Sequence, residues 1–205
     1  MKEYDILNRD GLSVDLLTRL SYKSELGISL KKTLRHFNKE ELFAELININ
    51  QWYDMQDLLY DIVIDYRIKS EQSARLKYYR YIEGREAEKV FNDLLGFRTL
   101  CDSYKEILAL KSKQFYIVDM SKGKAHDDGY RGVHVYFQID HFHYPIEIQY
   151  NTYYDRQINN WLHKYLYKKQ YPNNIGQKLR LRYEQGYIKN EFDFKEVFKD
   201  VLFNS

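Results

Sequence analysis

The sequence predicts an α+β (mixed α/β) domain, in which a small mixed β-sheet is flanked by helices. Apolar residues recur at helical spacing in the first third of the chain, alternate every second residue in the middle, and return to helical spacing towards the end. Only 2 Pro and 9 Gly interrupt the 205 residues, while 21 Tyr and 11 Phe supply large rings for a core. No repeat or linker marks a boundary, so we expect a single domain over residues 1–205.

The N-terminal third is expected to be helical. Asn38, followed by Glu41, forms a capping-box pattern in front of apolar residues at helical spacing. A second apolar stripe covers residues 58–63. A third helix is expected from Ser70, a good N-cap, to about Tyr81.

The middle of the chain is expected to form the sheet. A strand, a helix, a strand and a polar loop are expected in this order at 97–101, 104–110, 114–118 and 122–129. Alternation on either side of Asp140-His141 predicts a hairpin that turns at these two residues. Pro145 favours an edge position for the second strand of the hairpin, because proline cannot donate a ladder hydrogen bond.

The C-terminal part is expected to return to helix. A helix is predicted from about Thr152, with Ile158, Trp161 and Leu162 on its apolar face, and Pro172 either ends it or follows its end. One or two further helices are expected over residues 175–205.

Composition excludes several classes of protein. The 32 Lys and Arg against 30 Asp and Glu give a net charge of +2, which argues against coating nucleic acid by bulk charge but allows local basic patches. No apolar run approaches the ~18–20 residues of a membrane span, and the N-terminus has no signal-peptide pattern. The single cysteine, Cys101, excludes an internal disulfide and suits a small core residue in a reducing compartment. We therefore expect a cytoplasmic protein with no membrane partner.

A basic stripe is the first candidate for chemistry. On a helix, Lys69, Ser73, Lys77 and Arg80 fall within an arc of about 80°. Such a stripe near a helix start could grip a polyphosphate. A solvated basic face is the alternative, since Lys and Arg belong on surfaces.

Two further patterns carry carboxylates. Asp93 and Arg98 flank a glycine where a helix gives way to a strand, which suits a Mg²⁺ ligand and a base-stacking or phosphate-clamping arginine, or else a helix-end salt bridge. In the hairpin, the predicted register places His134 opposite Glu147, with Gln149 on the same face. This polar face suits catalysis, although a solvated sheet face would look similar. Neither a zinc motif nor a P-loop is present.

These segments, in this order, resemble the synthetase domain of the RelA/SpoT-homology family. The family pattern Arg-x-Lys-x-x-x-Ser-x-x-x-Lys matches residues 67–77, and Asp-x-x-Gly-x-Arg matches 93–98. Gly-Tyr-x-x-x-His, Glu-x-Gln-x-x-Thr, a Trp-x-His and a Tyr-Lys follow at 129–134, 147–152, 161–163 and 167–168. The match spans about residues 65–170, with helical flanks on both sides.

The resemblance implies a nucleotidyltransferase-like fold and a pyrophosphokinase, which transfers the β,γ-pyrophosphate of ATP to a ribose 3′-hydroxyl with Mg²⁺. It implies that Asp93 and Glu147 bind Mg²⁺ and that Glu147 takes the proton of the acceptor. The implied ATP-binding residues are Arg67, Lys69, Ser73, Lys77, Arg80 and Arg98. The implied acceptor-binding residues are Tyr130, Arg131, His134, Gln149, Lys122 and Lys124.

The motifs depart from those of ordinary alarmone synthetases. Asn151 stands where the family has arginine, and residues 121–128 lack the usual Pro-Lys. Residues 131–134, followed by Tyr136-Phe137, and residues 159–163 look more like those of the toxic small alarmone synthetases of toxin–antitoxin systems. This resemblance implies the 3′ CCA end of tRNA as acceptor, inhibition of translation and a protein antitoxin as partner. Lys31, Lys32 and Arg35 are then candidate tRNA contacts, or a solvated turn. An alarmone synthetase acting on GDP or GTP and an inactive nucleotide-binding module stay open as alternatives.

Overall fold

The computed structural model describes residues 5–169 and 171–203, which fall into two compact units. The first unit contains the described residues up to Thr99, together with Ala109–Ile117 and His134–Gln149. The second unit contains Leu100–Leu108, Val118–Val133 and the described residues from Tyr150 onward. Segments far apart in the sequence therefore build each unit.

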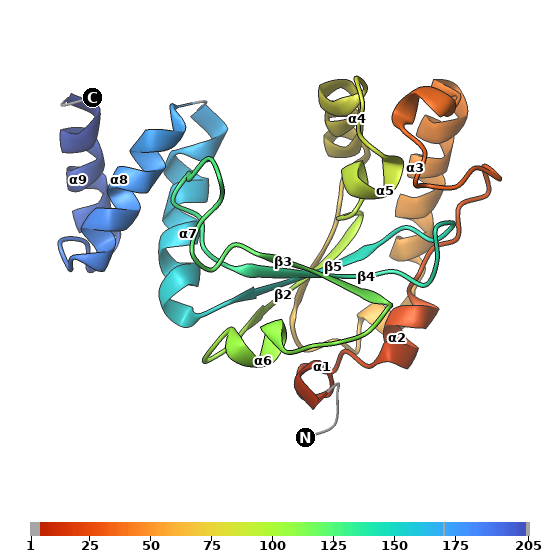
Figure 1. Ribbon diagram of the computed structural model, residues 1–205, viewed down its shortest axis with the longest axis horizontal. Helices are drawn as coiled ribbons and strands as arrows, with labels where there is room; N and C mark the ends of the chain where they lie inside the picture. Colours follow the sequence, from red (N-terminus) through yellow and green to blue (C-terminus); the bar gives the residue numbers. More distant parts are fainter. Residues whose placement is uncertain (1–4, 170, 204–205) are drawn as a thin grey trace. The chain divides into compact units, whose positions relative to one another are not determined.

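Five strands form one mixed sheet in the order β1-β2-β5-β4-β3 (Figure 1). Their bounds are Asp65–Ile68, Leu95–Leu100, Phe115–Asp119, Val133–Phe137 and Ile146–Asn151 for β1 to β5. β1 pairs with β2 in antiparallel fashion, with Arg67 opposite Gly96 and Asp65 opposite Arg98. The predicted fold class, a mixed sheet flanked by helices, is confirmed.

Five helices of the first unit are described, and two of them begin at N-caps that the sequence predicts. They are α1 (Asp5–Arg9), α2 (Val14–Arg19), α3 (Lys39–Asp54), α4 (Glu71–Tyr81) and α5 (Ala87–Val90), with 3-10 turns at Leu34–His36 and Asp57–Leu59. Asn38 Oδ1 accepts the backbone N–H of Glu41 at 3.1 Å, and Ser70 Oγ accepts that of Ser73 at 3.3 Å. Both predicted N-caps are thus confirmed. In Figure 1, α4 and α5 lie on one side of the strands of this unit, and α1 and α2 on the other.

The second unit is mostly helical. It holds α6 (Lys105–Leu108), α7 (Tyr153–Tyr165), a 3-10 turn at Tyr167–Lys169, α8 (Asn173–Glu184) and α9 (Glu191–Phe203). α7, α8 and α9 pack side by side (Figure 1), and their core contains Ile158, Trp161 and Leu162 as predicted. Thr152 caps α7, whereas Pro172 precedes α8 as its N-cap. The helix expected at 104–110 is limited to the four residues of α6.

The helix predicted for residues 58–63 is wrong. A 3-10 turn covers Asp57–Leu59, an irregular turn follows, and Val63 is 93% exposed. Three successive β-branched residues at 62–64 restrict side-chain rotamers in a helix, which disfavours its continuation. Of this apolar stripe, Leu59 is buried, whereas Leu58 and Ile62 are half-buried.

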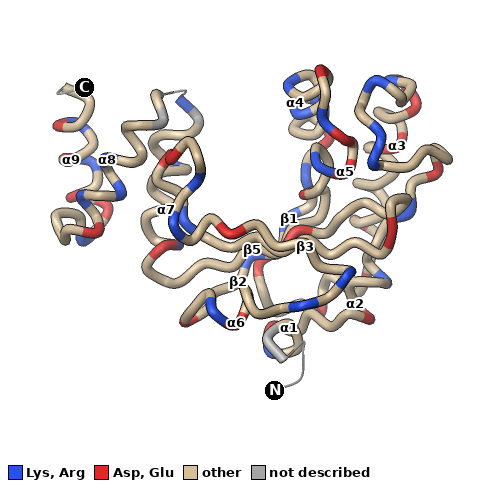
Figure 2. Tube along the Cα trace, in the orientation of Figure 1, with Lys and Arg blue, Asp and Glu red and all other residues tan. Residues whose placement is uncertain are grey.

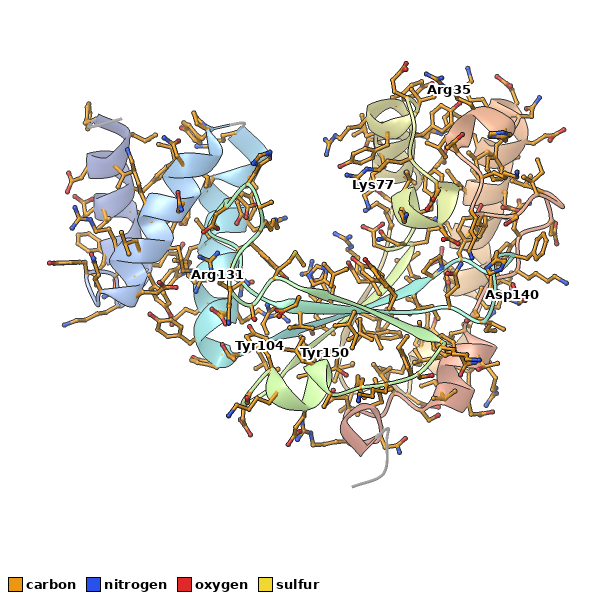
Figure 3. The ribbon with its side chains drawn as sticks, in the orientation of Figure 1. Arg35, Lys77, Tyr104, Arg131, Asp140 and Tyr150 are labelled. Atoms are coloured by element: carbon orange, nitrogen blue, oxygen red, sulfur yellow. The ribbon has the colours of Figure 1, made fainter. Side chains whose placement is uncertain are left out.

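The hairpin is also looser than predicted. β4 ends at Phe137 and β5 begins at Ile146, so residues 138–145 form a loop instead of a turn at Asp140-His141 (Asp140 is labelled in Figure 3). Side chains close this loop: Gln138 Nε2 donates to the carbonyl of His143 at 2.9 Å. The edge position predicted from Pro145 is wrong, because β5 is the central strand and Pro145 lies just before it, where no ladder hydrogen bond is lost.

Basic and acidic positions are mixed along both units (Figure 2). Cys101 is buried directly after β2, as predicted for a core residue. Among the described residues, no helix has the length and apolar character that crossing a membrane requires.

Candidate functional site

Three cations converge on the carboxylate of Asp93, in the turn between α5 and β2. Lys69 Nζ donates to Asp93 Oδ2 at 2.7 Å and Lys77 Nζ to Oδ1 at 3.0 Å. The guanidinium of Arg67 lies 3.5 Å from Oδ2. We call Arg67, Lys69, Lys77 and Asp93 the Asp93 cluster; one negative charge in it faces three positive ones. Such an excess of positive charge suits a polyanionic ligand.

Local structure explains why these side chains meet. The backbone N–H of Lys69 bonds to the carbonyl of Leu94 at 2.8 Å, which ties the end of β1 to the start of β2. α4 starts after the Ser70 cap, and Lys77 (labelled in Figure 3) follows about two turns later. Lys77 Nζ also donates to the carbonyl of Val90 at the end of α5.

The helical stripe predicted from the sequence is only partly right. Lys69 precedes the N-cap and is therefore not on the helix, although it reaches the same carboxylate as Lys77. Lys69 is only 7% exposed, which excludes a solvated face at this position. Burial lowers the pKa of Lys69, and Asp93 opposes that effect. Ser73 and Arg80 are exposed on α4.

Arg67 and Arg98 lie on the same face of the sheet. Arg67 is directly opposite Gly96, and Arg98 is two residues further along β2. Diagonal neighbours of this kind are about 7–8 Å apart. The two arginines therefore start from neighbouring backbone positions on one face of the sheet.

Glu147 on β5 forms a second polar centre. His134 Nδ1 lies 3.0 Å from Oε1, the Tyr136 hydroxyl donates to Oε1 at 3.0 Å, and Gln149 Nε2 donates to Oε2 at 2.7 Å. The predicted apposition of His134 and Glu147 is confirmed. Glu147 is 5% exposed, so its face of the hairpin is not simply a solvated surface.

The hydrogen bonds of Glu147 control its ionisation. Burial alone would raise its pKa, but the hydrogen bond and charge of His134, with the bonds from Gln149 and Tyr136, outweigh burial and lower the pKa to about 2. Glu147 is therefore a carboxylate at neutral pH. It is better suited to hold a cation or accept a hydrogen bond than to act as a strong base.

Gly96 keeps space open beside Glu147. A Cβ at position 96 would lie 3.5 Å from Glu147 Oε2, so these two residues of neighbouring strands are adjacent. Asp93 lies three residues before Gly96, next to the first residues of β2. Asp93 and Glu147, the two carboxylates predicted to act together, therefore both lie near the start of β2.

The carboxylates of the site suit Mg²⁺ only together with phosphate oxygens from a ligand. Among the described residues, no group of three or more His, Cys, Asp or Glu side chains could hold a metal ion. Asp93 and the ionised Glu147 offer carboxylate oxygens, and Mg²⁺ is commonly bound by one or two carboxylates plus substrate phosphates. The residues fit a magnesium ion that arrives with a phosphate ligand.

The Gly-Tyr loop, residues 127–131, belongs to the second unit. Arg131 (labelled in Figure 3) forms a double ion pair with Asp127, at 2.7 and 2.9 Å. Lys124 Nζ lies 5.0 Å from the centroid of the Tyr130 ring and pairs with Asp128 at 2.7 Å. Arg131 and Lys124 therefore already have anionic partners within this loop, while Lys122 is exposed.

Sequence reasoning missed Arg180, which supports this loop. Arg180 is 1% exposed, and its guanidinium donates to the carbonyl of Gly129, to Asp155 Oδ1 and to Asn159 Oδ1 at 2.9, 2.7 and 3.2 Å. Asn159 in turn donates to the carbonyl of Arg131 at 2.7 Å. The available signal was positional: Arg180 lies one helical turn after Gly176 and one before Tyr183, on the buried face of α8.

Asn151 holds the backbone of the Gly-Tyr loop from a buried position. It is 2% exposed, and its side-chain amide donates to the carbonyl of Arg131 at 2.8 Å. The position where the family has arginine therefore carries a buried amide in this chain.

The N-terminal cations lie on the surface of the first unit. Lys31 and Lys32 are exposed, and Arg35 forms an ion pair with Glu83. Exposed lysines fit both alternatives, a solvated turn and a phosphate contact.

Comparisons with known proteins find similarity among solved structures. No protein-family model and no curated protein matches the chain. Small alarmone synthetase 1 from Bacillus subtilis, bound to its product pppGpp, is 23% identical over 80% of this chain and 91% of that one, with a TM-score of 0.43. Small alarmone synthetase 2 from B. subtilis is 20% identical over 77% and 89%, with a TM-score of 0.42. A GTP pyrophosphokinase family protein from Streptococcus pneumoniae is 20% identical over 80% and 89%, with a TM-score of 0.39. Small alarmone synthetases are thus among the solved structures to which the chain is similar.

Proposed function

We propose that the chain is an ATP-dependent pyrophosphokinase that transfers the β,γ-pyrophosphate of ATP to a ribose 3′-hydroxyl. The observation that carries this proposal is the Asp93 cluster, an excess of buried and half-buried cations, in the same unit as an ionised, hydrogen-bonded Glu147. Phosphoryl-type transfer depends mainly on positioning and charge neutralisation, which such residues supply.

The Asp93 cluster is proposed to bind ATP. Lys69 and Lys77 neutralise the phosphates, with Ser73 and Arg80 further along α4. Arg67 and Arg98 hold the adenine between their guanidinium planes, which their diagonal register on one sheet face favours. In this assignment, the lysines and Arg80 face the triphosphate, and the two remaining arginines face the base.

Glu147 is proposed to orient the acceptor. The 3′-oxygen attacks the β-phosphorus of ATP, the bond from this phosphorus to the α,β-bridging oxygen breaks, and AMP leaves. Glu147 accepts the hydrogen bond of the 3′-hydroxyl and receives its proton as the new P–O bond forms. Because its pKa is about 2, this transfer occurs late, when bond formation has made the hydroxyl acidic.

Asp93 and Glu147 are the residues that would hold Mg²⁺. When bound, the ion supplies additional neutralisation of the phosphate charge. His134, Tyr136 and Gln149 keep Glu147 in place and ionised.

We propose the 3′ CCA end of tRNA as acceptor, and with it the role of a translation-inhibiting toxin that is neutralised by a protein antitoxin. Asn151 supports this choice, because its buried amide cannot hold the compact phosphates of GDP as the family's arginine could. In the proposed complex Tyr130 stacks on the acceptor base, beside Arg131, Lys122 and Lys124, and Lys31, Lys32 and Arg35 contact the tRNA backbone. GDP or GTP is the alternative acceptor.

The test is transfer of label from γ-labelled ATP to bulk tRNA, GDP or GTP. We expect label on tRNA, and loss of tRNA aminoacylation after the reaction. The Glu147→Gln variant should lower the rate at least about 10²-fold, and the exposed Glu40→Gln should leave it unchanged. Label on GDP or GTP alone would replace the tRNA proposal by alarmone synthesis. Absence of label on all three acceptors would refute the pyrophosphokinase.

A further inference from the structure

A cavity lies in the first unit, and Tyr136 is part of its wall. It measures about 460 Å³, within the usual range of ligand pockets. Its lining includes Lys31, Lys89, Lys113, Tyr116, Tyr136 and Gln138. We call it the tyrosine pocket; of its lining residues, Tyr136, which bonds to Glu147, and Lys31, a proposed tRNA contact, have roles described above.

Two stacked tyrosines form one wall of the tyrosine pocket. The rings of Tyr116 on β3 and Tyr136 on β4 are 6.3 Å apart with planes 29° from parallel. Tyr116 is 67% exposed. An exposed ring that is backed by a second ring is a rigid platform, and such platforms bind unstacked nucleic-acid bases.

Three lysines supply positive charge at the same pocket. Lys31 and Lys113 are exposed, and Lys89 is exposed but pairs with Glu86 at 2.6 Å. The lining also contains two carboxylates that already have donors. Glu88 accepts from Gln138 at 3.3 Å, and Asp140 accepts from the His143 ring at 2.7 Å. Ammonium groups are therefore available for phosphate oxygens next to an aromatic platform, the combination typical of single-strand binding sites.

Tyr136 connects this pocket to the reaction site. Its ring lines the tyrosine pocket, and its hydroxyl donates to Glu147 Oε1 at 3.0 Å. A ligand on the platform is thus one side chain away from the carboxylate that we assign to the acceptor hydroxyl. A polynucleotide acceptor continues beyond its terminal ribose and therefore has a further nucleotide to place there.

We propose that the tyrosine pocket binds a nucleotide of a single-stranded RNA 3′ end, upstream of the terminal nucleotide that reacts. The base stacks on Tyr116, and the phosphates lie towards Lys31 and Lys113. This inference rests on the proposed function, since it assigns a subsite for the polynucleotide acceptor.

The test measures RNA binding without ATP. A short, fluorescein-labelled single-stranded RNA that ends in CCA is titrated with the full chain, and fluorescence anisotropy gives Kd. Tyr116→Ala should weaken binding roughly 5- to 150-fold, because a stacked base contributes about 1–3 kcal/mol. Tyr116→Phe should bind within about twofold of the unchanged chain. Tyr60→Ala removes an equally exposed tyrosine of the same unit outside the pocket and should have no effect.

Transfer assays separate the two proposals. If the unchanged chain labels tRNA, Tyr116→Ala should raise the KM for tRNA, with thermal unfolding confirming that the variant is folded. An unchanged Kd and KM in Tyr116→Ala, or an equal loss in Tyr60→Ala, would overturn the pocket while leaving the pyrophosphokinase intact. RNA binding that depends on Tyr116, without any label transfer, would support the pocket and refute the proposed reaction.

Discussion

At the scale of single residues, Asp93 compensates a buried ammonium. Lys69 is taken out of water with Asp93 as its closest carboxylate partner at 2.7 Å, and both are nearly inaccessible. A buried ion pair contributes little net stability, but removal of one partner leaves the other charge uncompensated. Asp93 therefore affects folding as well as ligand binding.

The Asp93→Asn variant should be destabilised by about 3–5 kcal/mol, because the Lys69 charge loses its partner. Adding Lys69→Met should restore a large part of this loss, since the second change removes the uncompensated charge. Urea unfolding of both single variants and the double variant gives the coupling free energy. If the stability losses of the two single variants simply add in the double variant, the pair is not coupled.

Glu147 makes stability depend on pH in the acid range. Its pKa is about 2 in the folded chain against 4.5 for an ordinary glutamate, so the ionised group stabilises the fold at pH above about 4.5. This contribution disappears as pH falls towards 2. The contribution is on the order of 3 kcal/mol. The stability deficit of Glu147→Gln should therefore shrink between pH 6 and pH 3, measured by urea unfolding with a chelator present. A deficit that is constant with pH would contradict the ionisation state that we assign.

At the scale of elements, short-range sequence patterns predicted where helices begin, whereas strand pairing between distant segments was predicted poorly. The caps at Asn38, Ser70 and Thr152 depend on side chains within three residues, so the sequence alone located these helix starts. The central position of β5 depends on which strands pair across the chain, and a proline rule applied to Pro145 misplaced it. For the site, motif spacing located the charged residues, but the convergence on Asp93 and the burial of Arg180 arise from tertiary contacts between distant segments.

The packing of α8 against the Gly-Tyr loop requires two glycines. A Cβ on Gly176 of α8 would collide with the carbonyl of Asp128, and a Cβ on Gly129 would collide with the carbonyl of Gly176. Gly129 also has a φ of +86°, which L side chains rarely adopt. This close approach lets Arg180 reach the loop carbonyl.

The Gly176→Ala variant should lose about 1–3 kcal/mol of stability, because the added methyl forces the helix and the loop apart. It should also raise the KM for the acceptor, since Tyr130 belongs to the displaced loop, while ATP affinity stays the same. Gly84→Ala is the matched control, because a Cβ at that position meets open space. Equal acceptor KM values for Gly176→Ala and Gly84→Ala would show that the loop position does not matter for the acceptor.

At the scale of the whole molecule, charge is balanced overall and uneven locally. The net charge of +2 gives little long-range attraction to RNA, so affinity for a tRNA must come from individual phosphate contacts. Each such contact adds about 0.7–0.9 to the slope of log K against log salt. Salt dependence therefore counts local contacts, independently of any assignment of the catalytic residues.

Reversing Lys31 and Lys32 to Glu should weaken labelling of tRNA and lower its salt slope by up to about 1.4–1.8, the value for two lost phosphate contacts. ATP binding should be unchanged, because both side chains are exposed outside the Asp93 cluster. Reversing Lys189 and Lys195, exposed residues next to and within α9, changes net charge by the same amount and serves as the control. If both double variants lower the slope equally, the effect is one of net charge, and Lys31 and Lys32 do not contact the RNA. If neither lowers it, these lysines form the solvated turn that the sequence also allows.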